Sequence, residues 1–357
     1  MNYSPFINEG EMNSTNTRVR IAVEFLDSCQ FDCAGCFVKR RNEYSEHDLD
    51  ILLSAVDMFK AQGMDFDEVI LGPTDFFSAT NTIATLTNPK FKKIFENGDV
   101  VLTVLSTLQD TEEHILDVIK VVNEHYTHPN MEMEFLIPFN IQRVVNQDIM
   151  YVSEVQRKIQ LLDQLKPAVD YAMQLNIHDV DKMVDGFSLP KMTKFIRQNF
   201  QTIVEFNPSF MRARKAHIVK KVLAEWNTTL ETHVKELHAQ DITFTMVNQY
   251  HASFNETTYT YKDGHLYICP FIYENVVDLG PEFKIPKASD FYTIDDINSI
   301  DTKIIADQYE FASESECGDC EYLGSCVGKK AVYYMKQYDM RECIISKKLM
   351  AYYEGTL

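Results

Sequence analysis

Three cysteines near the N-terminus have the spacing of an iron-sulfur site. Cys29, Cys33 and Cys36 form a C-x3-C-x2-C pattern within the stretch CQFDCAGCF. Three thiolates this close in sequence can ligate one face of a cubane cluster and leave its fourth iron open to a small molecule. Zinc is the alternative, but structural zinc takes four protein ligands, and the next cysteine or histidine along the chain is His47. The spacing therefore favours a catalytic cluster with one open iron.

Four further cysteines near the C-terminus can complete a closed site. Cys317, Cys320 and Cys326 form a C-x2-C-x5-C pattern, and Cys343 follows. Four thiolates saturate a cubane cluster, so such a site would transfer electrons or stabilise the fold. Four-cysteine zinc sites share this composition and are the alternative here. The remaining cysteine, Cys269, stands apart from both groups.

Composition argues against several classes of function. The 357 residues include 34 Lys and Arg against 53 Asp and Glu, for a net charge of -19, which opposes binding to nucleic acid or to an anionic membrane. Residues 1–17 lack the pattern of a signal peptide, and no apolar run approaches the roughly 20 residues that a membrane helix needs. We therefore expect a flexible segment over residues 1–17 and a cytoplasmic location, where cysteines serve as ligands rather than disulfides.

The elements that must position these cysteines alternate between strands and helices. The run Arg18–Asp27 is rich in β-formers and ends just before Cys29, so the cysteine triplet follows a first strand. Ser45 and Asp48 predict a capping box for a helix that Gly63 can end. Periodicity predicts further strands over residues 67–72, 99–108, 131–139, 169–176 and 202–208, and helices over residues 88–96, 111–126, 152–165 and 191–200.

This alternation predicts an α/β fold, in which parallel strands curl into a partial (β/α)6 barrel similar to a TIM barrel. Active sites of such barrels lie at the C-terminal ends of the strands, where Cys29 falls. After Pro208, an amphipathic segment over residues 216–237 precedes an aromatic stretch in which Asp263 and Gly264 predict a β-hairpin. We expect a barrel domain over residues 18–240 and a cysteine-rich α+β domain over residues 241–357.

The stretch around the first three cysteines resembles the radical S-adenosylmethionine (SAM) superfamily, whose C-x3-C-x2-C loop follows the first strand of a partial (β/α)6 barrel. The resemblance implies a [4Fe-4S] cluster on Cys29, Cys33 and Cys36, with SAM on the open iron. In this family one electron, from a donor such as flavodoxin or ferredoxin, cleaves SAM to a 5′-deoxyadenosyl radical that abstracts hydrogen from the substrate. The family usually has an aromatic residue before the third cysteine. Here Gly35 stands there and Phe37 follows, which implies rearranged contacts to the adenine.

The resemblance also implies which residues contact SAM. The family's motif after the second strand corresponds by position to LGPTD, so Gly72, Thr74 and Asp75 are candidates to bind the amino group. Asn140 and Asn176 lie at the ends of later predicted strands, where the family binds the ribose and the carboxylate. The structural alternative is that all of these residues serve plain turns, in which Asn, Asp and Gly are common.

The C-terminal part resembles the SPASM extension of peptide-modifying radical SAM enzymes. Gly264 and Cys269 match its hairpin element, whereas Lys330 replaces the fourth cysteine of its C-x2-C-x5-C-x3-C run. The resemblance implies that a proximal auxiliary cluster is absent, and that one auxiliary [4Fe-4S] cluster is held by Cys317, Cys320, Cys326 and Cys343.

Cys269 has three interpretations. It can be a buried small hydrophobe, a replacement ligand of the distal cluster, or a thiol that donates hydrogen to a substrate radical, as in radical SAM epimerases. Pro270 stands where the anaerobic sulfatase-maturating branch has an acidic base, which disfavours that activity. We predict an oxidoreductase that acts on a peptide (RiPP-type) or small natural product and oxidises, crosslinks or epimerises it. The alternative is a non-catalytic iron-sulfur or zinc protein, which uses the fold as a scaffold or redox sensor.

Overall fold

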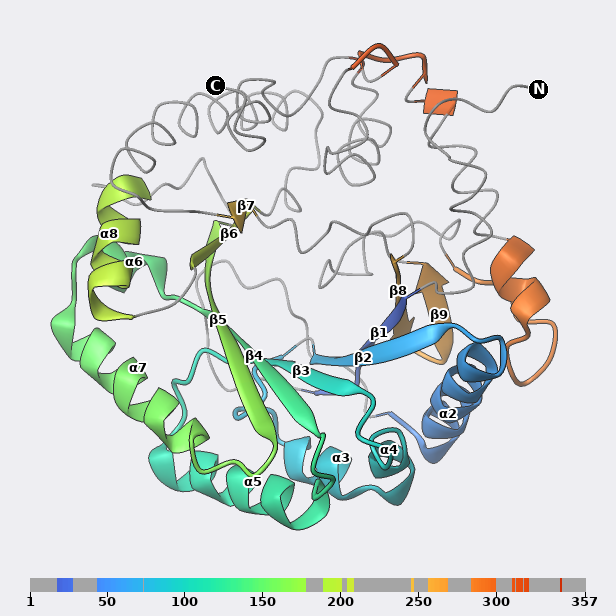
Figure 1. Cartoon of the computed structure of the whole chain (residues 1–357), viewed down its shortest axis with the longest axis horizontal. Coiled ribbons are helices and arrows are strands. Elements are labelled where there is room, and N and C mark those ends of the chain that lie inside the picture. Colours follow the sequence, from blue (N-terminus) through green and yellow to red (C-terminus); the bar gives the residue numbers. More distant parts are fainter. Residues whose placement is uncertain are drawn as a thin grey trace.

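A computed structural model gives the structure of the protein. It describes residues 18–27, 44–72, 74–177, 189–200, 204–208, 245–246, 256–268, 284–299, 310–311, 313–316, 318–320 and 341. Figure 1 shows the helices and strands that these residues form.

Among the described residues, nine strands form one sheet. Its order is β7-β6-β5-β4-β3-β2-β1-β8-β9, and all neighbours are parallel except the antiparallel pair β8 and β9. The first six strands therefore lie side by side in sequence order, as in the wall of a (β/α) barrel. The strands are β1 (Arg18–Glu24), β2 (Asp65–Gly72), β3 (Val101–Leu105), β4 (Glu132–Pro138), β5 (Ala168–Ile177), β6 (Val204–Pro208), β7 (Thr245–Met246), β8 (Glu256–Lys262) and β9 (His265–Ile268).

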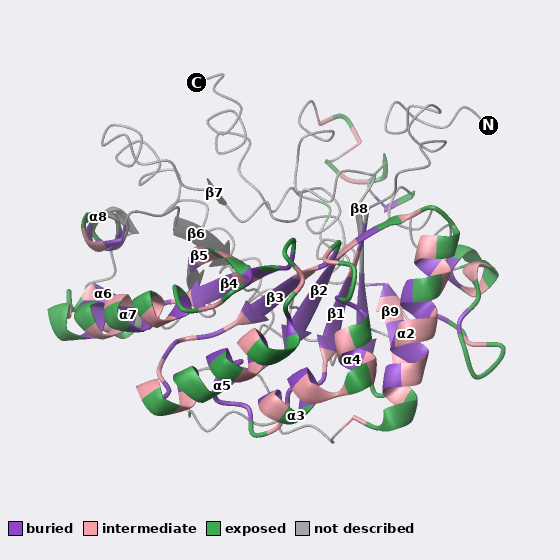
Figure 2. Cartoon of the chain, turned by 60° about the horizontal axis from the view of Figure 1, so that its bottom comes forward, coloured by how far each residue is buried: buried purple, intermediate pink, exposed green. Residues whose placement is uncertain are grey.

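Helices cover one face of this sheet, in an arc that follows its curve (Figure 1). Figure 2 shows buried residues on the strands and on the helix sides that face them, with exposed residues on the outer helix sides. The helices are α2 (Glu46–Ala61), α3 (Thr82–Thr87), α4 (Pro89–Lys93), α5 (Glu112–His125), α6 (Ile141–Val145), α7 (Ile149–Leu162) and α8 (Leu189–Asn199).

The two faces of the sheet differ in polarity. In β1, Val19, Ile21 and Val23 are buried in the hydrophobic core that also contains the apolar residues of α2 and α5. Alternate residues of a strand point to the opposite face. On that inner face, Nε of Arg20 lies 2.9 Å from Oε2 of Glu68 in β2. The helix-covered face is therefore the apolar one, and the inner face of the barrel wall carries charged side chains.

The predicted fold class is confirmed, because the predicted strands of the barrel are present and parallel. The capping box at the start of α2 is also confirmed, since the backbone N–H of Asp48 donates to the Ser45 hydroxyl and its carboxylate accepts from the backbone N–H of Ser45. Gly63 follows the helix with φ of 71°, a conformation that glycine adopts at little cost. The short helices α3 and α6 were not predicted, because a run of 6 or 5 residues is too short to show helical periodicity.

The predicted hairpin joins the barrel sheet directly. Asp263 and Gly264 have φ of 48° and 76°, so both central residues of the turn have the positive φ of a type I′ turn. Strand β8 pairs with β1, from Arg18 opposite Glu256 to Val23 opposite Tyr261. The sheet thus contains strands from both sides of residue 240, and the domain boundary there stays a prediction. Within the described ranges, no helix has both the length and the apolar character required to cross a membrane.

Candidate cofactor site at the strand ends

The end of β1 is held level with the end of β2. Glu24 lies opposite Gly72 in the parallel register, and the backbone N–H of Leu26 donates to the carbonyl oxygen of Gly72 over 3.1 Å. The described chain stops at Asp27, two positions before Cys29. The predicted ligands Cys33 and Cys36, and the predicted adenine contact Phe37, lie outside the described residues as well. The structure therefore fixes the root of the cysteine loop at the C-terminal edge of the parallel strands.

A buried hydroxyl without a partner lies just beyond Gly72. Thr74 is 2% exposed, and its Oγ1 has no hydrogen-bond partner among the described residues. A buried polar group without a partner is unfavourable, so such an atom commonly marks a ligand or water site. Nearby on the same edge, Nζ of Lys262 lies 3.7 Å from Oε2 of Glu24, and both side chains are largely buried. The edge thus carries polar groups where the sequence predicts the SAM site, and the contacts of Gly72 and Thr74 with SAM stay a prediction.

Asp75 is the most heavily hydrogen-bonded side chain of this region. It is 6% exposed, and its carboxylate joins the turn after β2 to the end of β3. The closest of its hydrogen bonds come from Thr107, whose backbone nitrogen lies 2.5 Å and whose hydroxyl lies 2.8 Å from Oδ2. The other donors are the backbone N–H groups of Phe77 and Ser78 and the hydroxyls of Ser78 and Ser106.

These donors fill the carboxylate of Asp75. Two oxygens offer about four lone pairs, so a direct contact between Asp75 and SAM would have to displace one of the present donors. Burial raises the pKa of Asp75, and the hydrogen bonds from Thr107 and Phe77 oppose that rise. The geometry supports a role of Asp75 in holding the turn that carries Gly72 and Thr74.

Asn140 and Asn176 lie at one level of the barrel wall. Pro138 of β4 is opposite Gln174 of β5. Asn140 follows Pro138 by two positions, and Asn176 follows Gln174 by two positions. Asn140 follows β4 and is exposed, and its Oδ1 caps α6 by accepting from the backbone N–H of Arg143 over 3.2 Å. Asn176 is described by its backbone alone, within β5 opposite Asn207. Both asparagines therefore sit at the C-terminal edge, as the sequence predicted, and their contact with SAM stays a prediction.

The base of the cysteine loop is anchored by the segment before α3. The Asn81 side chain accepts from the backbone N–H of Asp27 over 3.2 Å and donates to the carbonyl oxygen of Phe25 over 2.7 Å. Thr80 donates to the Asp27 carboxylate through both its backbone N–H and its hydroxyl. Sequence reasoning missed both residues, because a Thr-Asn pair before a short helix is typical of an ordinary turn. Only the tertiary contact with the end of β1 distinguishes them.

The C-terminal cysteine region is described in part. Cys320 is a half-buried free thiol, whereas Cys317, Cys326 and Cys343 lie outside the described residues. The backbone N–H of Glu316 donates to the carbonyl oxygen of Arg341 over 2.9 Å. Glu316 directly precedes Cys317, and Arg341 is two positions before Cys343.

Arg341 reinforces this contact between distant segments. Its Nη1 lies 2.9 Å from Oε2 of Glu314, and its guanidinium carbon lies 4.5 Å from the ring centroid of Phe311. The chain segments that carry the first and last predicted ligands of the distal cluster are therefore adjacent, as a shared site requires. Among the described residues, no group of three His, Cys, Asp or Glu side chains could hold a metal ion. The four-cysteine site stays a prediction.

Strand β9 sets the direction in which the chain approaches Cys269. His265 pairs with Lys262 at the C-terminal edge, and Ile268 pairs with Tyr259, which is level with Ile21 in the middle of β1. Cys269 follows Ile268 and lies outside the described residues. Its three interpretations therefore stay open.

Comparison with known proteins identifies the fold. No protein-family model matches the sequence, and no curated protein matches it. The solved structure of anSMEcpe with bound AdoMet (SAM) superposes with a TM-score of 0.54 at 12% identity, over 90% of this chain and 95% of that chain. The structure of anSMEcpe with AdoMet and the Cp18Cys peptide gives a TM-score of 0.52 at 12% identity, over the same shares of the two chains. The chain therefore has the fold of anSMEcpe, in agreement with the partial barrel that the sequence predicts.

Proposed function

We propose that this protein is a radical SAM enzyme, which reductively cleaves SAM and abstracts hydrogen from a peptide or small natural product. The observation that carries the proposal is the position of the end of β1. The described chain continues past β1 to Asp27, two positions before Cys29, and Glu24 of β1 lies opposite Gly72 at the C-terminal edge of the parallel strands. The buried unpartnered hydroxyl of Thr74 lies on the same edge, which fits a bound polar ligand.

The proposal assigns roles to residues of this edge. Cys29, Cys33 and Cys36 would hold the cluster, and bound there, the cluster and SAM together would supply hydrogen abstraction from an unactivated carbon. Gly72 and Thr74 would bind the amino end of SAM, with Asp75 holding their turn through Thr107 and Ser106. The remaining contacts to SAM would come from Phe37, Asn140 and Asn176.

The substrate proposal has two supports. The structure of anSMEcpe that shares this fold was solved with the Cp18Cys peptide, which favours a peptide substrate here. The inner face of the barrel wall carries Glu68 and Glu134, which share the hydroxyl of Thr103 at 2.6 and 3.5 Å. With Arg20 beside Glu68, this lining is polar and charged, which suits a polar substrate. Oxidation, crosslinking or epimerisation would follow hydrogen abstraction, with electrons from a flavodoxin or ferredoxin.

The C-terminal residues would form the second metal site of the proposal. Cys317, Cys320, Cys326 and Cys343 would hold one auxiliary [4Fe-4S] cluster in a domain over residues 241–357. The contact between Glu316 and Arg341 supports this ligand set, because it brings both ends of the motif together.

Cys269 is proposed as a hydrogen donor in the epimerisation branch of this chemistry. If the thiol has that role, Cys269→Ala should consume SAM and accumulate a substrate radical that is visible by electron paramagnetic resonance (EPR). A variant that releases the same product at the wild-type rate would leave Cys269 as a buried structural residue or a ligand.

The first experiment measures iron, sulfide and 5′-deoxyadenosine in anaerobically reconstituted protein, supplied with SAM and dithionite. The control is the triple variant with Cys29, Cys33 and Cys36 changed to Ala. Two cubane clusters correspond to about eight irons per chain, and SAM cleavage by the wild type alone supports the proposal. About four irons with cleavage would remove the auxiliary cluster. Bound zinc, or iron without cleavage, would favour the non-catalytic scaffold or redox sensor.

A further inference from the structure

Asn81 uses its side chain in an unusual way for its position. It is the N-cap residue of α3, where asparagine normally accepts a hydrogen bond from its own helix. Asn81 makes no such bond. Both polar atoms of its amide instead bind the backbone at the end of β1, at Asp27 N–H and at the Phe25 carbonyl oxygen. The amide therefore fixes the backbone just beyond the end of β1.

Thr80 fixes the next group along the same segment. Its backbone nitrogen lies 3.1 Å from Oδ1 of Asp27, and its hydroxyl lies 2.5 Å from Oδ2. Hydrogen bonds to an ionised acceptor are stronger than those between neutral groups. Together, Thr80 and Asn81 make four hydrogen bonds to Phe25 and Asp27, in a segment that ends two positions before Cys29.

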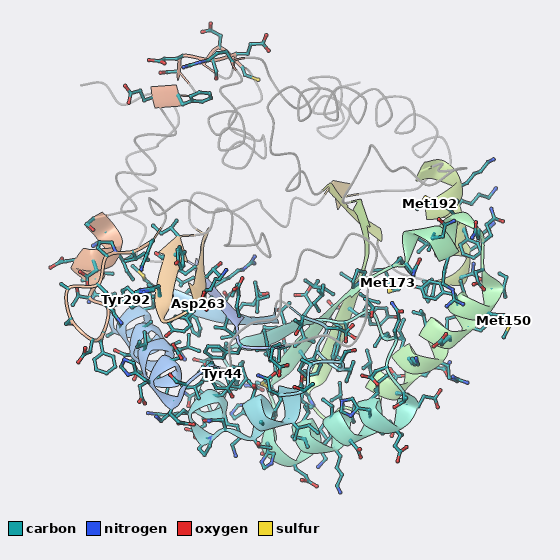
Figure 3. All side chains as sticks on the ribbon, turned by 180° about the vertical axis from the view of Figure 1, so that it is seen from behind. Tyr44, Met150, Met173, Met192, Asp263 and Tyr292 are labelled. Carbon is teal, nitrogen blue, oxygen red and sulfur yellow. The ribbon has the colours of Figure 1, made fainter. Side chains whose placement is uncertain are left out.

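The far end of the cysteine loop returns to the same place. The ring of Tyr44 stacks on that of Phe25, with centroids 4.4 Å apart and an interplanar angle of 28°. Figure 3 shows Tyr44 at the side of the molecule that carries α2, Asp263 and Tyr292. Phe25 also meets Phe91 and Tyr261 edge-on. The residues on both sides of the segment 28–43 therefore converge on one aromatic contact, and the amide of Asn81 holds the backbone of Phe25.

We propose that Thr80 and Asn81 are positioning residues for the N-terminal iron-sulfur cluster, which act by fixing the end of β1 from which Cys29 extends. The inference rests on the proposed function. Hydrogen bonds behind the ligands of a metal site orient those ligands, and their loss commonly weakens metal affinity or activity by about tenfold or more. Here they would set where the cysteine loop leaves the barrel, and so where the open iron lies relative to Gly72 and Thr74.

The chain provides a matched control for Asn81. Asn123, at the end of α5, makes the same pair of backbone hydrogen bonds at the opposite edge of the barrel. Its Nδ2 donates to the Gln164 carbonyl oxygen over 2.8 Å, and its Oδ1 accepts from the Lys166 N–H over 2.6 Å. Asn81→Ala and Asn123→Ala therefore remove equivalent interactions and should lower the thermal midpoint alike. Thr80→Val and Thr80→Ser form a second pair, because only the serine keeps the hydroxyl.

The test is a SAM titration of the reduced holoenzymes. The EPR signal of the cluster that binds SAM is recorded at each SAM concentration. We expect the SAM concentration for half-maximal change to rise about tenfold in Asn81→Ala and in Thr80→Val. The rate of iron loss to a chelator, a readout that needs no turnover, should rise in the same two variants. Asn123→Ala and Thr80→Ser should match the wild type in both measurements.

Two different results would overturn the inference, and the wild-type protein distinguishes them. Wild-type values for Asn81→Ala and Thr80→Val in both measurements would show that the hydrogen bonds serve only the stability of the barrel. Wild-type protein without any SAM-responsive cluster would remove the proposed function, and the inference with it. If Asn81→Ala does not fold, the comparison of Thr80→Val with Thr80→Ser alone tests the inference. These two variants differ from each other only in one exposed side chain.

Discussion

The hydroxyl of Tyr261 donates a 2.7 Å hydrogen bond to Oδ1 of Asp48, between residues 213 positions apart in the chain. Asp48 is the capping-box residue of α2, the helix that follows the cysteine loop, and Tyr261 belongs to β8. The contact therefore fixes the start of α2 against a strand from the C-terminal part of the chain. Phe25, at the end of β1, lies against the ring of the same Tyr261.

The hydrogen bond between Tyr261 and Asp48 should stabilise the fold. Tyr261→Phe removes the hydroxyl and keeps the ring contacts, so we expect a loss of about 1 kcal/mol in the free energy of unfolding. Urea unfolding followed by circular dichroism measures the difference. The control is Tyr267→Phe on the neighbouring strand β9, where the hydroxyl has no hydrogen-bond partner within the described part of the chain. Equal losses in both variants would contradict the assignment.

The same hydrogen bond predicts a dependence on pH. Burial alone would raise the pKa of Asp48, but hydrogen bonds from Ser45 and Tyr261 outweigh it, and the pKa is lowered. A lowered carboxyl pKa contributes stability that is present above the unfolded-state value, about 3.9, and is lost as the pH falls through the folded-state value. The difference between wild type and Tyr261→Phe should therefore shrink below about pH 4. A difference that stays constant on acidification would refute this.

His265 gives the second pH-dependent prediction, in the neutral range. Burial, with Lys284 and Lys287 nearby, lowers the pKa of His265 below its ordinary value. The folded protein therefore favours the neutral ring, and stability is lost as the pH falls below the unfolded-state value of about 6.5. We expect the thermal midpoint of the wild type to fall more than that of His265→Gln between about pH 7 and pH 5. Equal losses in the wild type and His265→Gln would contradict this assignment.

Asp75 gives a prediction about both stability and SAM binding. Asp75→Ala leaves the buried N–H group of Phe77 and the part-buried N–H group of Thr107 without an acceptor, so we expect a loss of about 3 kcal/mol in the free energy of unfolding. The turn that carries Thr74 should also lose its fixed position, which weakens SAM binding in the EPR titration. Asp99→Asn is the control, because Asp99 is a surface partner of Lys60 at 3.0 Å and such pairs contribute little. Unchanged SAM binding in a folded Asp75→Ala protein would limit this carboxylate to a structural role.

Gly318 gives a prediction about the distal cluster. A Cβ at this position would lie 2.8 Å from the backbone oxygen of Ser313, closer than real contacts allow. Gly318 lies between Cys317 and Cys320, so Gly318→Ala should distort this part of the site. We expect a loss of about four irons per chain, measured after reconstitution. Asp319→Ala, at the exposed neighbouring position, should keep its iron. A full iron content in Gly318→Ala would contradict this prediction, because the chain would then accommodate the added Cβ without disturbing the iron site.

Much of the barrel could be predicted from local sequence patterns. The capping box of Ser45 and Asp48 and the turn of Asp263 and Gly264 each depend on a few adjacent residues, and the structure confirms both. The apolar runs of β1 and β2 signalled their strands in the same way. The edge of the sheet that carries Gly72, Thr74 and Asp75 followed from the alternation of strands and helices.

The contacts that hold the candidate site could not be predicted in this way. Strand β8 pairs with β1, but no local pattern in either segment indicates that the two strands are neighbours. The amide of Asn81 could have capped α3, and only the tertiary fold directs it to Phe25. Asp75 resembles a ligand-binding residue in sequence, yet Ser106 and Thr107, from the next strand end, occupy its carboxylate. Local patterns determine secondary structure, whereas side-chain partners depend on long-range packing.

The pairing of β1 with β8 also has a consequence for biosynthesis. Arg18 is synthesised well before its partner Glu256, because the strands β2 to β7 lie between them in the chain. Until then, one side of β1 is an unpaired strand edge, which favours association with other chains. A nascent chain that ends near residue 240 would contain the strands β1 to β6 but not the neighbour that covers β1. The root of the cysteine loop is therefore expected to become stable only after β8 has been synthesised and has paired with β1.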